Sequence, residues 1–598
     1  MSRQSDPRAA RQSQSPGPAI LRTSRLRFRY DPATGCYAIS TVAAPLLVAL
    51  EAGAQLGLVR PGGIAETRHT GSANLDGWHE EATPDGIRLT TRRVWPDGLL
   101  MVQRFELVGE VPELRASATL RPPPDFNAAI RWFSPLAPPD NDRPNLVVSP
   151  WGPATHLLDI GWTANEPARS LPVNAHSPRE LVATGLGALG SAEHGTALTV
   201  GFLDGHQAVG EYRLRLGNGD DGRRGLSFAA TARLDPIDLP EMGLELAPLS
   251  LSFAPLDTAL CRFARSLGAG HAPPQLPPLA LWQMPTRQTP PTEEATLDEL
   301  SAVMNHPIAT DVDYVGLPVG WEARSGDWNS DSRRFPRGLR VLRDQIHAHS
   351  SRAALPIAPF VVAAESHLAR EHPTWLVRSE SSDPLAVPDG RGSDFYVLDA
   401  SQQPVREWLE KLGRLVAAEW GFDLARVGHL TPETWDGWRQ REGVSPLAAY
   451  REGVRAFREG LAGVPLLATD GPLFGAPDLA EILQSDAAPL LSARVTPLLR
   501  CFLREVGIPL TAGPAVIGAK DQSLEEARAV ATIAALSGGV ASPDGDLGTL
   551  RPERWQLWQV CLPPFPGALY PFDPFAPSGP HLFGAMVDRP WEEWLLLL

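Results

Sequence analysis

The sequence predicts a multidomain protein with an N-terminal antiparallel β-sandwich, a central (β/α)8 TIM-like barrel and a short C-terminal β segment. Three observations lead to this prediction. The chain of 598 residues is too long for one ordinary core, which favours two or three domains. From about residue 21 to 253, short runs alternate apolar and polar residues with a period of two. From about residue 279, short apolar runs alternate with amphipathic helical patterns, as in a parallel barrel.

The N-terminal part reads as a tail followed by the sandwich. Residues 1–20 are expected to be a disordered tail, because MSRQSDPRAARQSQSPGP is polar and lacks the apolar core of a secretory signal. The sandwich is predicted over residues 21–270, with hairpins in LRFRY-DPATG-CYAIS and GIRLTTRRVW-PDG-LLMVQRFEL. The stretch GLGALG at 185–190 matches the dinucleotide-loop pattern GxGxxG. That pattern requires a helix immediately afterwards, whereas SAEHGTALTVGF alternates like a strand, so we predict a glycine-rich turn.

The C-terminal half reads as a linker, a barrel and an appendage. Prolines in HAPPQLPPLALW predict a linker at residues 271–278, followed by a barrel domain over 279–545. Helices are expected in TLDELSAVM, with Thr296 and Glu299 as a capping box, in LRVLRDQIHAHS, and in SLEEARAVATIAALSGG, with Ser523 and Glu526 as a capping box and Gly538 after the end. Residues 546–598 are rich in proline and close on HLFGAMVDRPWEEWLLLL, which predicts a short β segment.

Composition excludes several classes of function. The net charge of −15, without a basic stripe, argues against nucleic acid and anionic membranes as partners. The four cysteines are scattered and form no CxxC pair, so neither a zinc ribbon nor a disulfide framework is indicated, and no metal or other cofactor is predicted. No window approaches the roughly 20 apolar residues of a transmembrane helix, so a cytoplasmic protein is expected. Nearly all positive charge is arginine, which together with 60 prolines and 53 glycines indicates a GC-rich bacterial genome.

Six segments of the barrel region occur in an order that is typical of one enzyme family. They are GDWNSDSRRFPRGL (326–339), ESHLAREHPTWLV (365–377), YVLDASQQPVREWL (396–409), AAEWGFDLARVGHL (417–430), ILQSDAAPLL (482–491) and ATIAALSGGVASPDGDL (531–547). With them the chain resembles the clan D glycoside hydrolases, specifically the family 36 α-galactosidases (melibiases), from about Leu21 to Leu598. The resemblance implies a carbohydrate or glycoside ligand at the C-terminal ends of the barrel strands. Members of the family often associate, so a homo-oligomer is an open alternative.

The resemblance also implies a two-carboxylate mechanism with retention of configuration, in which one carboxylate attacks the anomeric carbon and the other protonates the leaving oxygen. The nucleophile of the family lies at the end of the fourth barrel strand in a Lys-x-Asp motif. Here that motif reads Arg426-Val427-Gly428, and glycine supplies no nucleophile. The acid/base position on the sixth strand matches Asp486, while Ile482 stands where the family has an arginine.

Two other strand ends have also lost the acids of the family. The Asp-Asp-Gly-Trp of the second strand reads Pro318-Val319-Gly320-Trp321, and the Asp-Pro-Asp of the seventh reads Gly513-Pro514-Ala515. Residues that remain, or that are newly placed near the mouth, are expected to contact a sugar. These substrate-binding candidates are Trp282, Trp321, Asp327, Trp328, Glu365 and Arg426.

Two hypotheses follow. In the first, the protein is an enzyme that acts on α-linked sugars through a rearranged acid pair, with Asp486 as the acid and Asp470 or Glu433 assisting. Asp436, in the same loop TPETWDGW as Glu433, is a further acid near the predicted mouth. An inverting pair would need a separation of about 6.5–9.5 Å. The plainer interpretation makes Asp470 a turn residue before Gly471 and the loop acids solvated groups. In the second hypothesis, the protein is a catalytically inactive carbohydrate-binding or regulatory pseudoenzyme.

Overall fold

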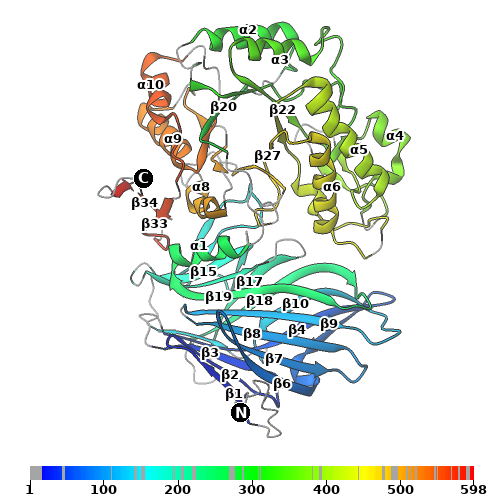
Figure 1. Ribbon diagram of the computed structural model, residues 1–598, viewed down its shortest axis with the longest axis vertical. Coiled ribbons are helices and arrows are strands. Elements are labelled where there is room, and N and C mark those ends of the chain that lie inside the picture. The colour runs from blue at the N-terminus through cyan, green and yellow to red at the C-terminus, as the bar shows by residue number, and fades with distance from the viewer. Residues whose placement is uncertain are drawn as a thin grey trace, which may run out of the picture. The chain divides into compact units, whose positions relative to one another are not determined.

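The computed structural model describes residues 17–42, 47–109, 111–139, 144–149, 155–174, 176–191, 193, 195–203, 208–218, 224–267, 276–285, 289–306, 309, 311–379, 381–388, 394–441, 443–474, 479–485, 496–506, 510–513, 515–518, 522–544, 547, 550–567, 569–576, 580–586 and 593–597. The chain divides into two compact units (Figure 1). The sandwich unit comprises residues 1–159, 169–263 and 574–578, and the barrel unit comprises 160–168, 264–573 and 579–598. Most of the predicted tail, 1–16, and the first part of the predicted linker, 271–275, lie outside the described residues.

The sandwich unit is built from two antiparallel sheets, as predicted. The first runs β1-β2-β3-β4-β10-β18-β17-β14, with β5 and β11 also paired to β4, and the second runs β13-β12-β15-β16-β19-β9-β8-β7-β6. The strands of the first sheet are β1 (Ala19–Arg22), β2 (Leu26–Tyr30), β3 (Tyr37–Thr41), β4 (Leu47–Arg60), β5 (Ile64–His69), β10 (Ala129–Ala137), β11 (Leu146–Ser149), β14 (Glu180–Thr184), β17 (Val209–Asn218) and β18 (Arg224–Asp238). Those of the second are β6 (Asn74–Thr83), β7 (Gly86–Val94), β8 (Leu100–Val108), β9 (Glu113–Arg121), β12 (Thr155–Asp159), β13 (Arg169–Pro172), β15 (Leu186–Ser191), β16 (Thr196–Phe202) and β19 (Leu244–Pro255).

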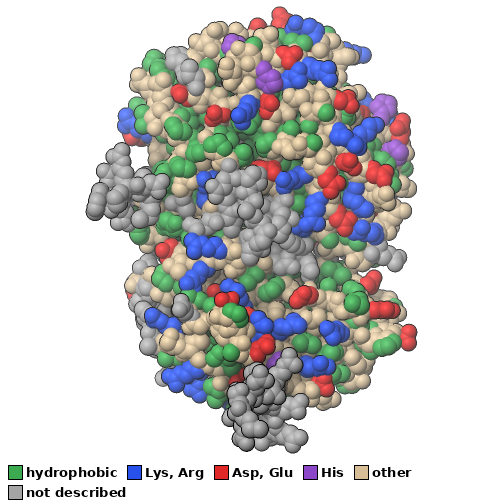
Figure 2. All heavy atoms as spheres, viewed as in Figure 1, with side chains coloured by type: hydrophobic (Ala, Val, Ile, Leu, Met, Phe, Trp, Pro, Cys, Tyr) green, Lys and Arg blue, Asp and Glu red, His purple; other side chains and the backbone are tan. Residues whose placement is uncertain are grey.

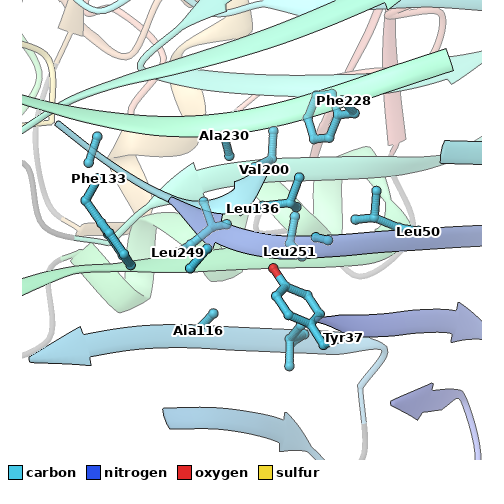
Figure 3. Close-up of a cluster of buried hydrophobic side chains, with 14 of the residues drawn as sticks. Tyr37, Leu50, Ala116, Phe133, Leu136, Val200, Phe228, Ala230, Leu249 and Leu251 are labelled. Atoms are coloured by element: carbon cyan, nitrogen blue, oxygen red, sulfur yellow. The ribbon is translucent and has the colours of Figure 1, made fainter. Parts of the chain in front are cut away.

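Period-two alternation places one face of each sheet in a shared core. In β2 the burial pattern alternates strictly, and Phe28 lies 5.1 Å from Phe105 of the second sheet, measured between ring centroids. Figure 3 shows Tyr37, Phe228 and Leu251 among the clustered side chains of this core. The hydroxyl of Tyr37 is satisfied there, because it donates a hydrogen bond to the Pro135 carbonyl at 2.8 Å. The two predicted hairpins are present as β2–β3 and β7–β8.

The prediction of a turn at GLGALG is wrong. Leu186–Ser191 forms strand β15, which pairs with β12 and β16. A Cβ atom on Gly190 would lie 2.4 Å from the ring of Phe575, so this glycine lets the aromatic ring rest on the strand. The inference against a dinucleotide loop is confirmed, because strand β16 follows instead of a helix.

The barrel unit contains the predicted closed barrel of eight parallel strands. Its order is β21-β22-β26-β27-β28-β29-β31-β20, and β20 closes the ring by pairing with β21 as well as β31. The strands are β20 (Leu279–Gln283), β21 (Tyr314–Gly316), β22 (Arg352–Ile357), β26 (Leu424–Val427), β27 (Leu466–Ala468), β28 (Ile482–Gln484), β29 (Leu510–Thr511) and β31 (Gly539–Ala541). The short strands β30 (Ala515–Val516) and β32 (Pro543–Asp544) extend the sheet, and β23 (Val361–Ala363), β24 (Ala386–Pro388) and β25 (Asp394–Val397) form a small antiparallel sheet.

Helices surround the barrel strands (Figure 1). They are α2 (Glu293–Met304), α3 (Leu339–Ala348), α4 (His367–Glu371), α5 (Gln403–Arg414), α6 (Pro446–Leu461), α8 (Thr496–Leu499), α9 (Leu524–Leu536) and α10 (Pro552–Cys561); helix α1 (Leu256–Leu267) follows the last sandwich strand. None of the helices in the described ranges is long and apolar enough to cross a membrane. Figure 2 shows arginine and acidic side chains interspersed on the face that it draws. Between α5 and α6 they line a groove of about 480 Å³, where Arg406 pairs with Glu452 at 3.0 Å.

The helix boundaries confirm one predicted cap and correct another. At α9, Ser523 and Glu526 form the capping box, and Gly538 follows the last turn with a φ of 121°. At α2 the helix begins earlier than expected, because Thr292 and not Thr296 is the N-cap residue. The buried carboxylate of Glu293 accepts a hydrogen bond from the Arg337 amide at 2.9 Å, which fixes the first turn before Thr296.

The C-terminal segment contains the predicted strands. They are β33 (Leu569–Pro571), β34 (Leu582–Met586) and β35 (Glu593–Leu597), which form an antiparallel sheet. Helix α10, which precedes them, was not expected. Its sequence PERWQLWQVC shows little periodicity, so the pattern carried no signal for it.

A buried arginine in the sandwich unit gives a stability prediction. Arg93 is 1% exposed and donates to the Tyr30 hydroxyl at 2.8 Å, to the carbonyls of Thr70 (3.2 Å) and Ala73 (2.8 Å), and to that of Pro32. Lysine cannot reproduce this fork of donors, so Arg93→Lys should lower the free energy of unfolding by about 2–4 kcal/mol in urea denaturation.

The neighbouring Arg92→Lys is the matched control for this experiment. Arg92 is exposed and contacts Asp76 at 3.0 Å, so its replacement should change the unfolding free energy by less than about 0.5 kcal/mol. Equal effects of the two substitutions would contradict the anchoring role of Arg93.

Candidate active site

The inner face of the barrel is layered from bottom to mouth. A lower layer is apolar and takes one or two buried residues from most strands, including Leu281, Tyr314 and Leu424. Because side chains alternate along a strand, residues two positions further on face the same interior. Those positions hold Gln283, Gly316 and Arg426, with Gln484 on β28. A polar layer therefore lies above the apolar one.

Arg426 and Gln484 meet in this polar layer. The guanidinium of Arg426 donates to the amide oxygen of Gln484 at 3.1 Å, across the intervening strand β27. Gln283 lies on strand β20, across the closed barrel from β27. Its side-chain amide donates to the Leu317 carbonyl at 2.6 Å. Its buried Oε1 has no hydrogen-bond partner among the described residues. Arg426, a predicted substrate-binding residue, thus lies at the mouth, and Gln283 and Gln484 are polar neighbours that the motifs did not reveal.

Gly428 lies two positions after Arg426, directly beyond the end of strand β26. Its amide donates to the Ile357 carbonyl of β22 at 2.9 Å, which ties the backbone to the neighbouring strand. A Cβ atom there would lie 3.0 Å from Oγ1 of Thr469. The position that the resemblance assigns to a nucleophile therefore holds only backbone, next to the hydroxyl of Thr469.

The three tryptophans predicted to contact a sugar are buried within the barrel unit. Trp282 and Trp321 are fully buried, and the Trp321 indole donates to the Pro356 carbonyl at 2.8 Å. Trp328 lies 6.1 Å from Trp321 between ring centroids and is 4% exposed. Its indole nitrogen is buried and has no partner in the part of the chain that the structure describes. The structure brings Trp321 and Trp328 together, but protein atoms cover most of their ring surfaces.

Asp327 and Glu365 both lie at the N-terminal end of helix α4. The Asp327 carboxylate accepts hydrogen bonds from the amides of His367 at 2.8 Å and Leu368 at 3.3 Å, at the N-terminus of that helix. Glu365 is exposed, and its carbonyl accepts from the Arg324 guanidinium. The described contacts of Asp327 are therefore those of a helix cap.

Asp470 is engaged by the loop that follows Gly428. One carboxylate oxygen accepts from the Leu430 amide at 3.0 Å and the other from the Thr431 amide at 3.1 Å. The Gly471 amide in turn donates to the Thr431 hydroxyl at 3.1 Å. Asp470 thus fixes the path of the chain after β26, while the residue proposed as its partner, Asp486, lies outside the described residues, as does Pro514.

Glu433 lies in the same loop but is sealed from solvent, with 0% exposure. One of its oxygens accepts from the Ala400 amide at 3.3 Å, and the other has no partner among the described residues. Burial, opposed by Arg439 and reinforced by the charge of Asp399, raises the pKa of Glu433 from 4.5 to about 8. Glu433 is therefore a buried, neutral acid at pH 7. Asp436, three residues further on, is exposed.

The motifs did not single out Glu322, an acid beside the predicted sugar-binding motif of the second strand. It follows Trp321 directly, and burial raises the pKa of its carboxyl group. Its carboxylate accepts from the Ser325 hydroxyl at 3.2 Å. The signal available in the sequence was an acid one residue beyond the Gly-Trp pair.

Within the described residues, no cluster of three His, Cys, Asp or Glu side chains could hold a metal ion.

Residues 160–168, between strands β12 and β13, form part of the barrel unit and not of the sandwich unit. The Ala164 amide donates to the Gly471 carbonyl, and the Leu473 amide donates to the Trp162 carbonyl, both at 2.9 Å. Arg500, which is fully buried, holds this segment with its guanidinium. Its acceptors are the carbonyls of Ile160 (2.7 Å), Ala164 (2.7 Å) and Glu166 and the hydroxyl of Ser485 (2.9 Å). The segment is thereby fixed against the ends of β27 and β28.

Comparison with known proteins agrees with this architecture. Residues 310–423 match the family model described as Melibiase. Alpha-galactosidase 2 of Pediococcus pentosaceus is 32% identical over 90 residues, which are 15% of this chain and 12% of that protein. The A type blood alpha-D-galactosamine galactosaminidase of Flavonifractor plautii is 27% identical over 137 residues, which are 21% of this chain and 12% of that protein. The matched segments thus cover only a small part of these relatives.

Solved structures match between 81% and 97% of the chain. The α-galactosidase TtGalA of Thermus thermophilus, in complex with stachyose, aligns with a TM-score of 0.55 and 21% identity over 81% of this chain and 99% of that chain. The family 36 α-galactosidase AgaA of Geobacillus stearothermophilus aligns with a TM-score of 0.63 and 13% identity over 97% of this chain and 91% of that chain. At this identity the likeness shows the fold. Together these findings confirm the resemblance to family 36 α-galactosidases.

The buried acid gives a pH-dependent stability prediction. Between pH 4.5 and 8 the folded state keeps a proton on Glu433 that the unfolded state has released, so this group destabilises the fold as the pH rises. Glu433→Gln removes that dependence. The difference in unfolding free energy, variant minus wild type, should increase from pH 5 to pH 8 by at most about 1.4 kcal/mol per pH unit. The exposed Glu365→Gln is the control, and a difference that stays constant across this range would contradict the prediction.

The loop contact of Asp470 gives a second prediction. Asp470→Ala leaves the amides of Leu430 and Thr431 without their acceptor, which should speed hydrogen exchange at these two positions and lower the unfolding free energy by about 1–3 kcal/mol. Amide exchange followed by mass spectrometry or NMR measures the effect. Asp298→Ala, at an exposed position of α2, should leave the exchange of both amides unchanged.

Proposed function

We propose that this chain binds α-linked sugars at the mouth of its barrel without cleaving them through the retaining two-carboxylate route. The observation that carries the proposal is Gly428. It stands at the end of β26 where the resemblance requires the nucleophile, and no side chain is present to attack an anomeric carbon. Loss of one essential group from such a pair costs several orders of magnitude in rate.

Three of the described acids near the mouth are bound to backbone amides or enclosed, which supports the proposal. Both oxygens of Asp470 accept backbone amides, Asp327 caps α4, and Glu433 is enclosed. A carboxylate that satisfies loop amides would leave those donors unpaired if it turned towards a substrate. A rearranged acid pair built on Asp470 would therefore disturb the loop that follows Gly428.

Polar groups and homology support a sugar as the ligand. Arg426, Gln484 and Gln283 form a polar layer above the apolar barrel floor, and the Gln283 oxygen is an acceptor without a partner among the described residues. Pyranose hydroxyls are suitable donors for such an acceptor. The aligned structures of Thermus thermophilus and Geobacillus stearothermophilus enzymes were solved with stachyose and raffinose, which are α-linked oligosaccharides.

The residues that differ from the family favour a changed mode of binding. Pro318 and Val319 replace the two carboxylates of the second strand, so sugar hydroxyls that those acids held would be buried without partners. A bound galactoside is therefore expected to make other contacts than those that the family makes at the second strand.

Hydrolysis and binding assays test the proposal together. Without an added nucleophile, wild type, Asp486→Asn and Asp470→Asn should all leave aryl α- and β-glycosides uncleaved above background, while isothermal titration detects binding of methyl α-D-galactopyranoside or raffinose to the wild type. Arg426→Met should weaken that binding about tenfold, and Arg340→Met, at an exposed position of α3, should not change it. Turnover that disappears in either aspartate variant would show a hydrolase with a rebuilt acid pair, and NMR of the product anomer would give its stereochemistry.

Azide tests where the sugar binds. Dinitrophenolate leaves without help from an acid, so cleavage of a 2,4-dinitrophenyl α-galactoside requires only a nucleophile. Azide that enters beside Gly428 can attack the anomeric carbon as the phenolate departs. The expected product is the β-galactosyl azide, formed by the wild type and reduced by Arg426→Met. Saccharide binding without any azide product would place the sugar away from Gly428 and contradict the proposed position.

A further inference from the structure

Two tryptophans in the loop after β26 are exposed. Trp438 is 71% exposed and Trp435 is 39% exposed, within the sequence TPETWDGW. Tryptophan is among the residues that proteins bury most on average, so an exposed pair that is three positions apart needs an explanation. The motifs of the sequence and the proposed mouth residues do not use either ring.

The backbone that carries Trp438 is firmly held. It pairs with Arg378 in both directions: the Arg378 amide donates to the Trp438 carbonyl at 3.0 Å, and the Trp438 amide donates to the Arg378 carbonyl at 2.7 Å. A Cβ atom on Gly437 would lie 2.6 Å from a methyl carbon of Val377, so only glycine allows this close approach. The ring of Trp438 is thus presented to solvent by a fixed loop.

Trp435 is held by the same part of the loop. Its amide donates to the Pro432 carbonyl at 3.1 Å, and its own carbonyl accepts from the Arg439 guanidinium at 3.4 Å. Arg439 also donates to the Gly437 carbonyl at 3.4 Å. A ligand that stacks on these rings would therefore meet preformed surfaces and would not need to order the loop.

The position of the loop indicates what it binds. The loop of Trp438 follows β26, and the segment that pairs with it follows β22, so both excursions start from the C-terminal ends of barrel strands. That end of a parallel barrel is where its ligands bind. Asp436 and Gln440, two positions before and two after Trp438 in the sequence, are exposed polar residues of the same loop. A pyranose offers the matching combination of an apolar C–H face and peripheral hydroxyl groups.

We propose that Trp438, together with Trp435, forms an accessory saccharide subsite that stacks on a sugar unit of an oligosaccharide beyond the unit held near Gly428. This inference rests on the proposed function of sugar binding at the barrel mouth. It implies a selectivity for chain length, because only a saccharide long enough to span from the mouth to the tryptophans would use both places.

Titration with sugars of different length tests the subsite. Methyl α-D-galactopyranoside, raffinose and stachyose are titrated into wild type, Trp438→Ala, Trp438→Phe and Trp435→Ala. Trp438→Ala should weaken stachyose binding about tenfold and change methyl galactoside binding by less than twofold. Trp438→Phe should recover most of the stachyose affinity, because an aromatic face remains. Val560→Ala, at an 87% exposed position of α10, is the control for loss of an exposed apolar side chain.

The outcomes separate this inference from the proposed function. Equal stachyose affinities of wild type and Trp438→Ala, with methyl galactoside still bound, would overturn the subsite and leave the mouth in place. Stachyose binding that depends on Trp438, without binding of methyl galactoside, would support the subsite and contradict the mouth. A wild type that binds none of the three sugars would overturn both. A dimer in size-exclusion chromatography that Trp438→Ala dissociates would assign the tryptophans to a protein interface and overturn the subsite.

Discussion

Closure of the barrel is the constraint on which the candidate site depends. Strand β20 pairs with neighbours on both sides, so the eight strands have no free edge and end at a common rim. The strands are short, from two residues in β29 to six in β22. Alternation therefore leaves room for one apolar layer, one polar layer and a rim position such as Gly428. Residues at the rim can be replaced while the apolar layer still stabilises the closed barrel. A fold of this kind can therefore be kept when the activity at its rim changes.

The acids near the rim illustrate a competition between loop structure and chemistry. Loops at the end of a barrel carry backbone amides that need acceptors when they are buried. Asp470 supplies two acceptors, and Asp327 supplies acceptors for the start of α4. The enclosed carboxyl of Glu433 remains neutral at pH 7, and one of its oxygens has no partner in the described part of the chain. The sequence shows an acid in each case, whereas only the structure shows which need of the backbone each one serves.

Pattern and motif were sufficient for the architecture and for the place of the rim. Period-two runs located the sandwich strands, and the Arg426-Val427-Gly428 tripeptide falls at the end of β26, next to β22 and β27 in the sheet. Local sequence patterns did not predict features that depend on contacts between residues far apart in the sequence. The start of α2 depends on the contact of Glu293 with Arg337, which lies 44 residues away. The GLGALG stretch is a strand because small residues admit a distant phenylalanine, and the exposure of Trp438 depends on pairing with Arg378.

The contacts of Arg500 also impose an order on folding during synthesis. The guanidinium contacts the Ile160 carbonyl across 340 residues of sequence, so the segment 160–168 leaves the ribosome long before its anchor exists. At 5–20 residues per second the delay is roughly 20 to 70 s. Strands β12 and β13 can pair during that time, but the connection between them has to wait for a residue that arrives after six of the barrel strands. A nascent chain that stops before Arg500 would carry this segment without the donors that fix it, so the mouth of the barrel is among the last parts of the molecule to be completed.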